Sequence, residues 1–240
     1  MRAFYISDRA VVQCLIALVF CLVISSCTSK QDWVNEEINE EFVYRVFAAS
    51  PEDTIQISSR GGWPEGMIAG EYINVNNISL EVGGYCISAC VEYVLSATKQ
   101  GYLRDSPIIA VHGNPTIYET QKRTLNGEDN LICQGGAVAR AYVNFEKTMA
   151  ISPKYSEHQA DILSLVKLGK KQLDNGCYQP LPEYKVDYWL LGTADLNKYF
   201  SGNFEGSTCG LREVICRKKL DAFFKKGTVL SDGRETYKTR

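Results

Sequence analysis

The spacing of hydrophobic residues predicts alternating strands and helices in the first half of the chain. Residues 54–59 alternate between hydrophobic and polar side chains, which is typical of a half-buried strand. Residues 65–73 repeat apolar side chains at helical spacing and predict a helix. A second strand is expected over residues 78–82, and Gly83-Gly84 is expected to turn the chain.

The next two predicted elements are more hydrophobic. Residues 88–97 predict a buried helix, and the continuous apolar run of residues 107–111 is typical of a buried parallel strand that ends at His112. Such alternation of strands and helices favours parallel strands joined by right-handed crossovers. The pattern therefore predicts an α/β fold.

The second half of the chain predicts more helix than strand. Residues 114–135 are polar and rich in turn-forming residues, as expected of an insertion. The other expected elements are two helices within residues 136–173 that divide at Ser152-Pro153, a strand at 186–191, a helix at 194–200 and an amphipathic stretch at 214–224.

The amino terminus has the pattern of an export signal. Residues 10–24 are apolar and follow two arginines, as in a signal peptide, and they are fewer than the roughly 20 residues that span a membrane. They run into Ser25-Ser26-Cys27, which resembles a bacterial lipobox, where the cysteine receives the lipid. We expect a protein anchored to a membrane through Cys27, on the periplasmic side of the bacterial envelope. A secretory peptide cut elsewhere and an uncleaved anchor are the alternatives.

These patterns divide the chain into four segments. They are a lipoprotein signal peptide at residues 1–26, a polar tether at 27–53, the α/β domain at 54–200 and a carboxyl-terminal tail at 201–240. A short helix or first strand is expected within the tether, around residues 42–47.

Nine cysteines are the unusual feature of the composition. Cys14 and Cys21 would leave with the signal peptide and Cys27 would carry lipid, so an even number remains. An exported chain of this kind is expected to form up to three disulfides, whose pairing the sequence leaves open. A zinc site is less favoured, because the chain has no Cys-x-x-Cys pair and only two histidines. The remaining cysteines are Cys86, Cys90, Cys133, Cys177, Cys209 and Cys216.

Charge and composition exclude several classes of protein. The chain has 26 basic and 28 acidic residues, a net charge of −2, without the basic block of a nucleic-acid binder. Hydrophobic residues make up 45% of the 240 residues, as in a folded globular protein. We expect no nucleic-acid partner and no cofactor.

Three features that can carry chemistry lie at the ends of predicted strands, where α/β folds place their sites. Gly61-Gly62 follow the first strand, and their amides can approach a ligand closely. Ser88 begins the buried helix, where its hydroxyl lies near free amides. His112 ends the third strand, and an imidazole with an ordinary pKa of about 6.5 suits a general base. Together they indicate a serine hydrolase.

The same segments resemble a known family. Residues 55–62 are similar to the Ser-Pro-Gly-Gly loop of the proteolytic subunit of Clp protease, and residues 84–90 and 111–113 match the positions of its nucleophile and histidine segments. The resemblance covers about residues 55–200 and implies the Clp/crotonase fold, a spiral of βαβ units. Closer still is a family of predicted periplasmic, Clp-protease-like proteins, which share Cys86-x-Ser88-Ala89-Cys90, His112 and Tyr188-Trp189-Leu190.

The resemblance assigns roles to individual residues. Ser88 would be the nucleophile and His112 its base, and the Gly61-Gly62 loop with the amide of Ala89 would form the oxyanion hole.

The acidic member of the triad stays open. Asp161 keeps the family's spacing from the histidine, whereas Glu183 and Asp187 precede the Tyr-Trp-Leu strand, where local matching would put the acid. We favour Glu183 or Asp187, because an orienting carboxylate raises the basicity of the imidazole and fixes its tautomer.

The chain departs from the family beside the candidate site. Arg60 stands where the family has a proline, and Cys86 and Cys90 flank Ser88. The two cysteines fit either a disulfide that pins the loop or two buried thiols, and we expect the disulfide.

These features predict a lipid-anchored, exported serine hydrolase, a peptidase that works without ATP on peptide or protein substrates. The alternative is a catalytically inactive Clp-like binding or scaffold lipoprotein of the envelope. A crotonase-like acyl-CoA enzyme is disfavoured, because export removes the cofactor supply. The resemblance also implies a homo-oligomer.

Overall fold

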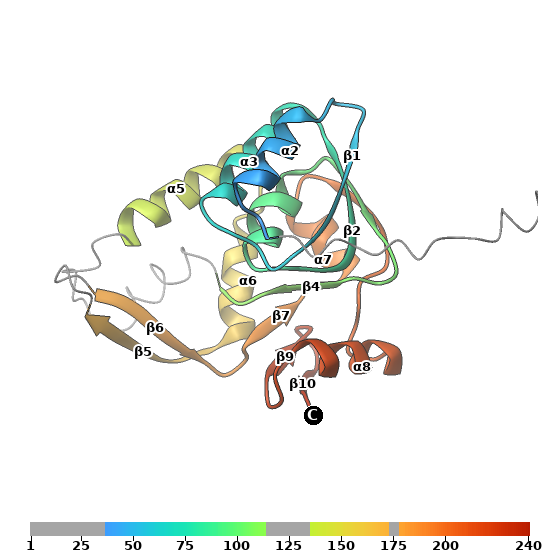
Figure 1. The fold of residues 1–240 in the computed structure, drawn as a ribbon. Coiled ribbons are helices and arrows are strands. Elements are labelled where there is room, and N and C mark those ends of the chain that lie inside the picture. The colour runs from blue at the N-terminus through green and yellow to red at the C-terminus, as the bar shows by residue number, and fades with distance from the viewer. Residues whose placement is uncertain (1–36, 114–134, 173–177) are drawn as a thin grey trace, which may run out of the picture. The chain divides into compact units, whose positions relative to one another are not determined.

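A computed structural model describes residues 37–113, 135–172 and 178–240 of the chain (Figure 1). The chain divides into two compact units, Met1–Asp32 and Trp33–Arg240, and every described residue belongs to the second. The expected signal peptide and Cys27, residues 114–134 of the expected insertion, Cys133 and Cys177 lie outside the described residues. In the part that is described, no helix combines the length and hydrophobicity needed to cross a membrane.

Parallel strands form the centre of the main sheet. One edge of β2 (Ser79–Ile87) pairs with β1 (Thr54–Ser59). The opposite edge pairs first with β3 (Gln100–Leu103) and then with β4 (Ile108–Val111). All three pairings are parallel. The alternation of strands and helices predicts this for β1, β2 and β4, whereas β3 was not predicted. The mixed α/β class is confirmed.

The expected turn at Gly83-Gly84 is wrong, because both glycines lie inside β2. Gly84 adopts φ +59°, and a Cβ there would lie 2.8 Å from Oγ of Ser58 on β1. The register of β1 on β2 also shifts at this level. The glycines therefore bend a continuous strand where β2 exchanges one neighbour for the next, as glycine does at bulges.

The last 40 residues of the chain add strands to the same sheet. β7 (Tyr188–Leu190) pairs antiparallel with β4, and β9 (Val229–Ser231) pairs parallel with β7. β10 (Thr236–Lys238) closes one edge, and β8 (Asn203–Gly206) extends the other beside β3. The expected tail thus contributes three strands to the main sheet.

The second helix expected within residues 136–173 is shorter than predicted. α5 (Gly135–Thr148) and α6 (Lys154–Leu163) divide at Pro153 as expected, but α6 ends at Ser164, which adopts left-handed φ +49°. The chain continues as β5 (Leu165–Gln172), which pairs antiparallel with β6 (Tyr178–Tyr184) in a separate two-stranded sheet (Figure 1).

Helices cover both faces of the main sheet, and the side chains of β2 and β4 alternate between two hydrophobic clusters. The larger cluster contains Cys86, Ile109 and Val111, and the smaller contains Ile87 and Ala110. α8 (Val214–Phe223) covers the smaller cluster through Cys216 and Leu220. The larger cluster is covered by α2 (Glu40–Ala48), α3 (Glu65–Val75), η1 (Cys90–Val94), η2 (Leu95–Ala97), α5, α6 and α7 (Thr193–Tyr199).

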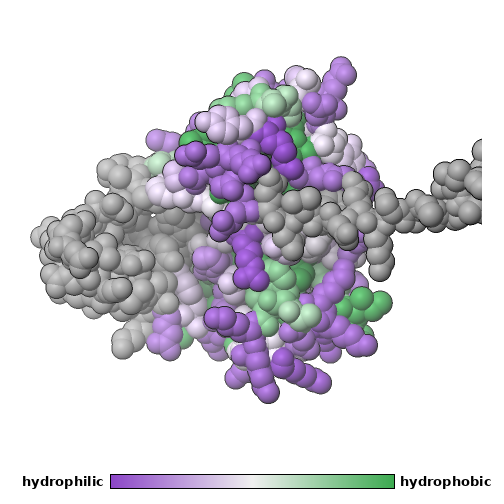
Figure 2. All heavy atoms as spheres, in the orientation of Figure 1, coloured by the Kyte–Doolittle hydropathy of each residue, from purple (hydrophilic) through white to green (hydrophobic). Residues whose placement is uncertain are grey.

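The end of the expected tether is the helix α2. The side chain of Asn39 accepts a hydrogen bond of 3.1 Å from the amide of Phe42, which caps the helix at its start. Phe42 and Val46 are fully buried against the domain. Hydrophilic side chains cover most of the face in Figure 2, and hydrophobic atoms are exposed where Figure 1 places α2 and α3 and where it places α8.

Candidate functional site

The residues that the sequence singles out lie side by side at the ends of four neighbouring strands, and we call them the row. Gly61 follows β1, Ser88 follows β2, His112 follows β4, and Tyr188 begins the antiparallel strand β7. Ser88 therefore lies between the glycine loop and the histidine. The last paired residues that fix this order are Ser59 with Cys86, Ile87 with Ala110, and Val111 with Trp189.

Ser88 occupies a strained position between a strand and a helix. Its φ is +57°, in the left-handed region that residues other than glycine seldom adopt. Its amide donates a 2.9 Å hydrogen bond to the carbonyl of Ala110, and its carbonyl accepts from the amides of Val91 and Glu92 at 2.9 and 3.0 Å. Main-chain bonds on both sides thus hold the serine in this conformation, and its side chain stays half-buried.

A disulfide brackets the serine. Cys86 at the end of β2 and Cys90 at the start of η1 are bonded, with Cα atoms 5.3 Å apart, and both are buried. The bridge closes a loop with Ser88 at its centre, so the strand and helix that position the serine are covalently joined. A second disulfide joins Cys209 to Cys216.

The glycine loop packs directly against the start of the helix. Gly61 has φ +98°, and a Cβ on it would lie 2.7 Å from the amide nitrogen of Cys90 and 2.8 Å from that of Ala89. The amide of Gly61 donates a 3.0 Å hydrogen bond to Oγ of Ser59. Among the described residues, the amides of Gly62 and Ala89 have no hydrogen-bond acceptor. These two N–H groups are the donors that remain for a ligand.

His112 packs edge-on against Tyr188, with ring centroids 5.5 Å apart and planes at 83°. The residue keeps an exposed surface, but the protein atoms around its ring partly desolvate the imidazole. This desolvation lowers the pKa of His112 below 6.5, and a hydrogen bond to its own main chain opposes the change. The ring is therefore neutral at pH 7, the state that a general base requires.

The described residues contain no hydrogen bond between Ser88 and His112, and none of the three candidate acids bonds to the histidine there. Oδ2 of Asp187 instead accepts a 2.7 Å hydrogen bond from the amide of Val229. Glu183 is exposed on β6, opposite Lys167, and Asp161 is exposed on α6. The identity of the acid stays a prediction.

The strand that carries Glu183 nevertheless reaches the histidine segment. A Cβ on Gly113, the residue after His112, would lie 3.1 Å from the hydroxyl of Tyr184, the residue after Glu183. Asp187 has a comparable link, because the residue after it, Tyr188, packs against the ring of His112.

An aromatic group beside the row was not predicted from the sequence. Phe223 at the end of α8 lies 4.6 Å from Tyr85, and Phe224 lies 4.9 Å from Tyr188, measured between ring centroids. The guanidinium of Arg60 lies 4.5 Å above the ring of Phe223. The Phe-Phe pair at the end of the amphipathic stretch was visible in the sequence, but no local pattern ties it to residues far away in the chain.

A buried carboxyl lies one helical turn beyond the serine. Oε1 of Glu92 accepts a 3.1 Å hydrogen bond from the side-chain amide of Gln159 on α6. Burial raises the pKa of Glu92 well above its usual value, the hydrogen bond from Gln159 lowers it, and the nearby Glu146 raises it further. The hydroxyls of Tyr142 and Tyr155 are also buried there. The helix that begins beside Ser88 is thus tied to α6 through a carboxyl that favours its protonated form.

The wild type should lose free energy of unfolding as the pH rises, because Glu92 becomes charged while buried. The Glu92→Gln variant should not show this loss. The folded-state pKa of Glu92 is raised, so its favourable contribution is complete below about pH 4.5 and is lost as the pH rises towards the folded pKa. Urea unfolding from pH 4.5 to 8 should show Glu92→Gln gaining on the wild type by on the order of 1–3 kcal/mol. Glu71→Gln, on the exposed side of α3, is the control that should follow the wild type. Equal pH dependence in the Glu92→Gln variant and the wild type would contradict the interpretation.

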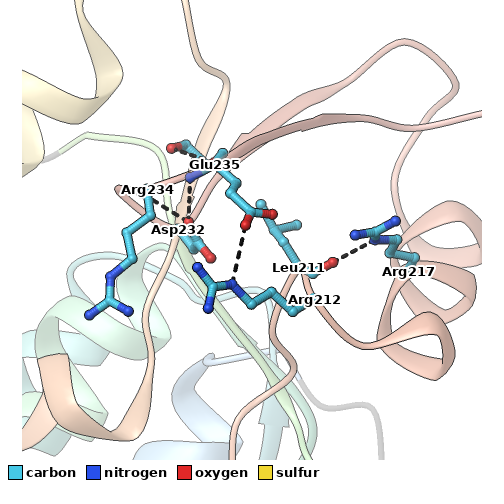
Figure 3. A network of polar contacts seen from close by, with 7 residues as sticks. Leu211, Arg212, Arg217, Asp232, Arg234 and Glu235 are labelled. Atoms are coloured by element: carbon cyan, nitrogen blue, oxygen red, sulfur yellow. Dashed lines mark hydrogen bonds and ion pairs between the residues drawn. The ribbon is translucent and has the colours of Figure 1, made fainter.

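A cavity of about 370 Å³ lies at the other end of β7. It is lined by Gly192, Thr208 and the loops that carry Arg212 and Arg234, and by none of the residues of the row. Figure 3 shows Arg212 paired with Glu235 at 3.2 Å, and Asp232 accepting the amides of Arg234 and Glu235. These bonds shape the turn between β9 and β10 and are separate from the candidate site.

Comparison with known protein families and with curated proteins finds no match for this chain.

Proposed function

We propose that this protein is a serine hydrolase, a peptidase independent of ATP, with Ser88 as nucleophile and His112 as general base. One observation carries the proposal. A serine in left-handed conformation ends the central strand, with a glycine main chain packed against its helix on one side and a histidine on the neighbouring strand on the other. A strained serine at a strand-to-helix turn is a recurrent way to expose a nucleophilic hydroxyl.

The chemistry follows from these groups. Oγ of Ser88 forms a bond to the carbonyl carbon of the substrate while His112 takes the hydroxyl proton. The bond to the leaving amine then breaks, and His112 gives the amine that proton. A water molecule attacks the acyl-serine by the same route, so one water is consumed and Ser88 is restored.

The oxyanion of the intermediate would accept hydrogen bonds from the amides of Gly62 and Ala89. They belong to two segments that pack together beside Ser88, so neither needs a large movement to serve one oxygen atom. We propose Glu183 as the acid, since the carboxylate of Asp187 already accepts a hydrogen bond from the amide of Val229.

We extend the proposal to the fold family and the compartment. Parallel strands with the glycine loop, the serine and the histidine at adjacent ends support a Clp/crotonase-like arrangement. The disulfides Cys86–Cys90 and Cys209–Cys216 fit an oxidising compartment and support export to the periplasmic side. The lipid anchor at Cys27 is part of the proposal and is supported only by the lipobox-like sequence that ends there. A homo-oligomer belongs to the same proposal.

The test is reaction with a fluorophosphonate probe followed by mass spectrometry of the adduct. We expect the label on Ser88 in the folded protein and its loss after unfolding in urea. Ser106 is a matched internal control, since it is also half-buried and also has left-handed φ, +49°, but does not lie in the row. Failure of Ser88 to react at any pH between 6 and 9 would overturn the proposal.

A second candidate function has its own support. The described residues hold no hydrogen bond between Ser88 and His112 and no carboxylate bonded to the imidazole. Both facts favour a protein that keeps the arrangement of a hydrolase but only binds its ligand. A folded protein that never reacts with the probe would favour this alternative.

A further inference from the structure

Arg60 lies at the edge of the candidate site. It links β1 to Gly61, whose main chain touches the start of the helix that follows Ser88. Because adjacent Cα atoms are about 3.8 Å apart, the Arg60 backbone adjoins the glycine that packs on Ala89 and Cys90, the residues that follow Ser88. Its exposed side chain reaches over Phe223 on the face of the sheet where Tyr188 contacts His112.

The charge of Arg60 is uncompensated within the described residues. None of the carboxylates in those residues forms an ion pair or hydrogen bond with its guanidinium. The charge still acts on the site, because burial raises the pKa of Tyr188 and the positive charge of Arg60 opposes that rise. By contrast, Arg104 and Arg212 both pair with glutamates. A cation without a partner beside a reactive serine is available to a ligand.

An aromatic ring supports this cation. The guanidinium carbon of Arg60 lies 4.5 Å from the centroid of the Phe223 ring, and a guanidinium over an aromatic face keeps N–H groups that can turn towards a ligand. Phe223 is held in turn, since its ring packs against Tyr85 and Phe224. The guanidinium is thus supported by packed aromatic rings, and its donors remain free to form two parallel hydrogen bonds with a carboxylate.

We infer that Arg60 binds a carboxylate of the substrate, so that the protein prefers acidic peptides or free carboxyl termini. This inference rests on the proposed hydrolase function and names its substrate class. The shared chemistry is a carboxylate near the bond that is cleaved. An acidic side chain and a carboxyl terminus are the two sources that an experiment must separate.

The experiment measures how well short peptides protect Ser88 from the fluorophosphonate. Four tripeptides separate the sources: Ala-Ala-Ala, its carboxyl-terminal amide, Ala-Asp-Ala amide and Ala-Asn-Ala amide. We expect at least one carboxylate peptide to protect the full-length protein at about 10- to 100-fold lower concentration than its neutral counterpart, the range of a charge-assisted hydrogen bond. The pair that differs identifies the source.

Variants assign the effect to the guanidinium. Arg60→Gln should abolish the difference between carboxylate and neutral peptides but still react with the probe, and Arg60→Lys should keep part of it. Arg234→Gln, which removes an exposed guanidinium at the other end of the sheet, is the matched control and should keep the full difference. If Ser88 reacts but all four peptides protect equally or not at all, or if Arg60→Gln keeps the difference, the inference is wrong and the hydrolase proposal stands. If Ser88 never reacts, the proposed function fails and this inference fails with it.

Discussion

Replacing Ser88 by alanine should lower kcat/KM for an activated ester at least about 1000-fold, since the attacking oxygen is lost. The free energy of unfolding should change by less than about 1 kcal/mol, because the main-chain hydrogen bonds of residue 88 do not need its hydroxyl. The Ser106→Ala variant is the control for serine removal at a left-handed position and should keep full activity. An active Ser88→Ala variant would assign the hydrolysis to another nucleophile.

A double variant tests whether Ser88 and His112 act together. His112→Ala should lower kcat/KM by a similar factor, and the Ser88→Ala/His112→Ala double variant should be no worse than the poorer single variant. Residues that act as one unit are strongly non-additive, whereas independent contributions multiply. Multiplied losses in the double variant would show that the serine and the histidine do not act together.

The pH profile of the wild type tests the state of the same imidazole. A general base must be neutral, so kcat/KM should rise with pH through the pKa of His112 and then level off. Desolvation lowers this pKa, so the midpoint should lie below 6.5 and activity should be near its plateau at pH 7. A midpoint well above 6.5 would contradict this expectation and would mean that a negative charge close to the imidazolium outweighs the desolvation.

Local patterns in the sequence were enough to predict the elements that carry the row. The strand at Thr54–Ser59 agrees with the alternation that predicts it, and the apolar run before His112 is β4. Each of these two strands follows from a pattern within its own residues, alternation in the first and a continuous apolar run in the second. Their parallel pairing then brings the glycine loop, Ser88 and His112 to adjacent strand ends, as the alternation of strands and helices implies.

Other elements depend on partners that are distant in sequence. Gly83-Gly84 is a turn by local rules. However, β1 pairs with β2 before and after the two glycines, β3 pairs before them and β4 after them, so the glycines bend a strand instead. β8, β9 and β10 have three or four residues each, too few for a periodic pattern, and exist because β3 and β7 offer free edges.

The same reason explains which parts of the site the sequence missed. The ring of Phe223 meets Arg60 across 163 positions of the chain, and only the packing of α8 on the small cluster brings them together. The identity of the acid could not be predicted for the same reason, since spacing suggests Asp161 and local matching suggests Glu183 or Asp187. The contacts that bear on the choice of acid, such as the hydrogen bond from the amide of Val229 to Asp187, form only on folding.

Replacing Gly61 by alanine should damage both the fold and the candidate site. The residue has φ +98°, which strains any residue with a Cβ, and the new methyl group would lie 2.7 Å from the amide nitrogen of Cys90. The three nearest atoms are the amide nitrogens of Cys90 and Ala89 and the Cβ of Ala89, which has no side-chain torsion to rotate away. Cys90 is also held by the disulfide to Cys86, so neither residue yields easily. Strain and overpacking together should cost about 3–5 kcal/mol in the free energy of unfolding.

Urea unfolding followed by the fluorescence of the buried Trp189 measures the cost, and Gly210→Ala is the matched control. A Cβ on Gly210 would meet no atom within 4 Å, so this variant should stay within about 1 kcal/mol of the wild type. Wild-type stability in Gly61→Ala would mean that the loop does not pack on the helix. If the folded fraction of Gly61→Ala loses both hydrolysis and probe reaction, the close packing of this glycine is what keeps the amides of Gly62 and Ala89 together. A stable but inactive variant is not expected, because one contact serves both the fold and the site.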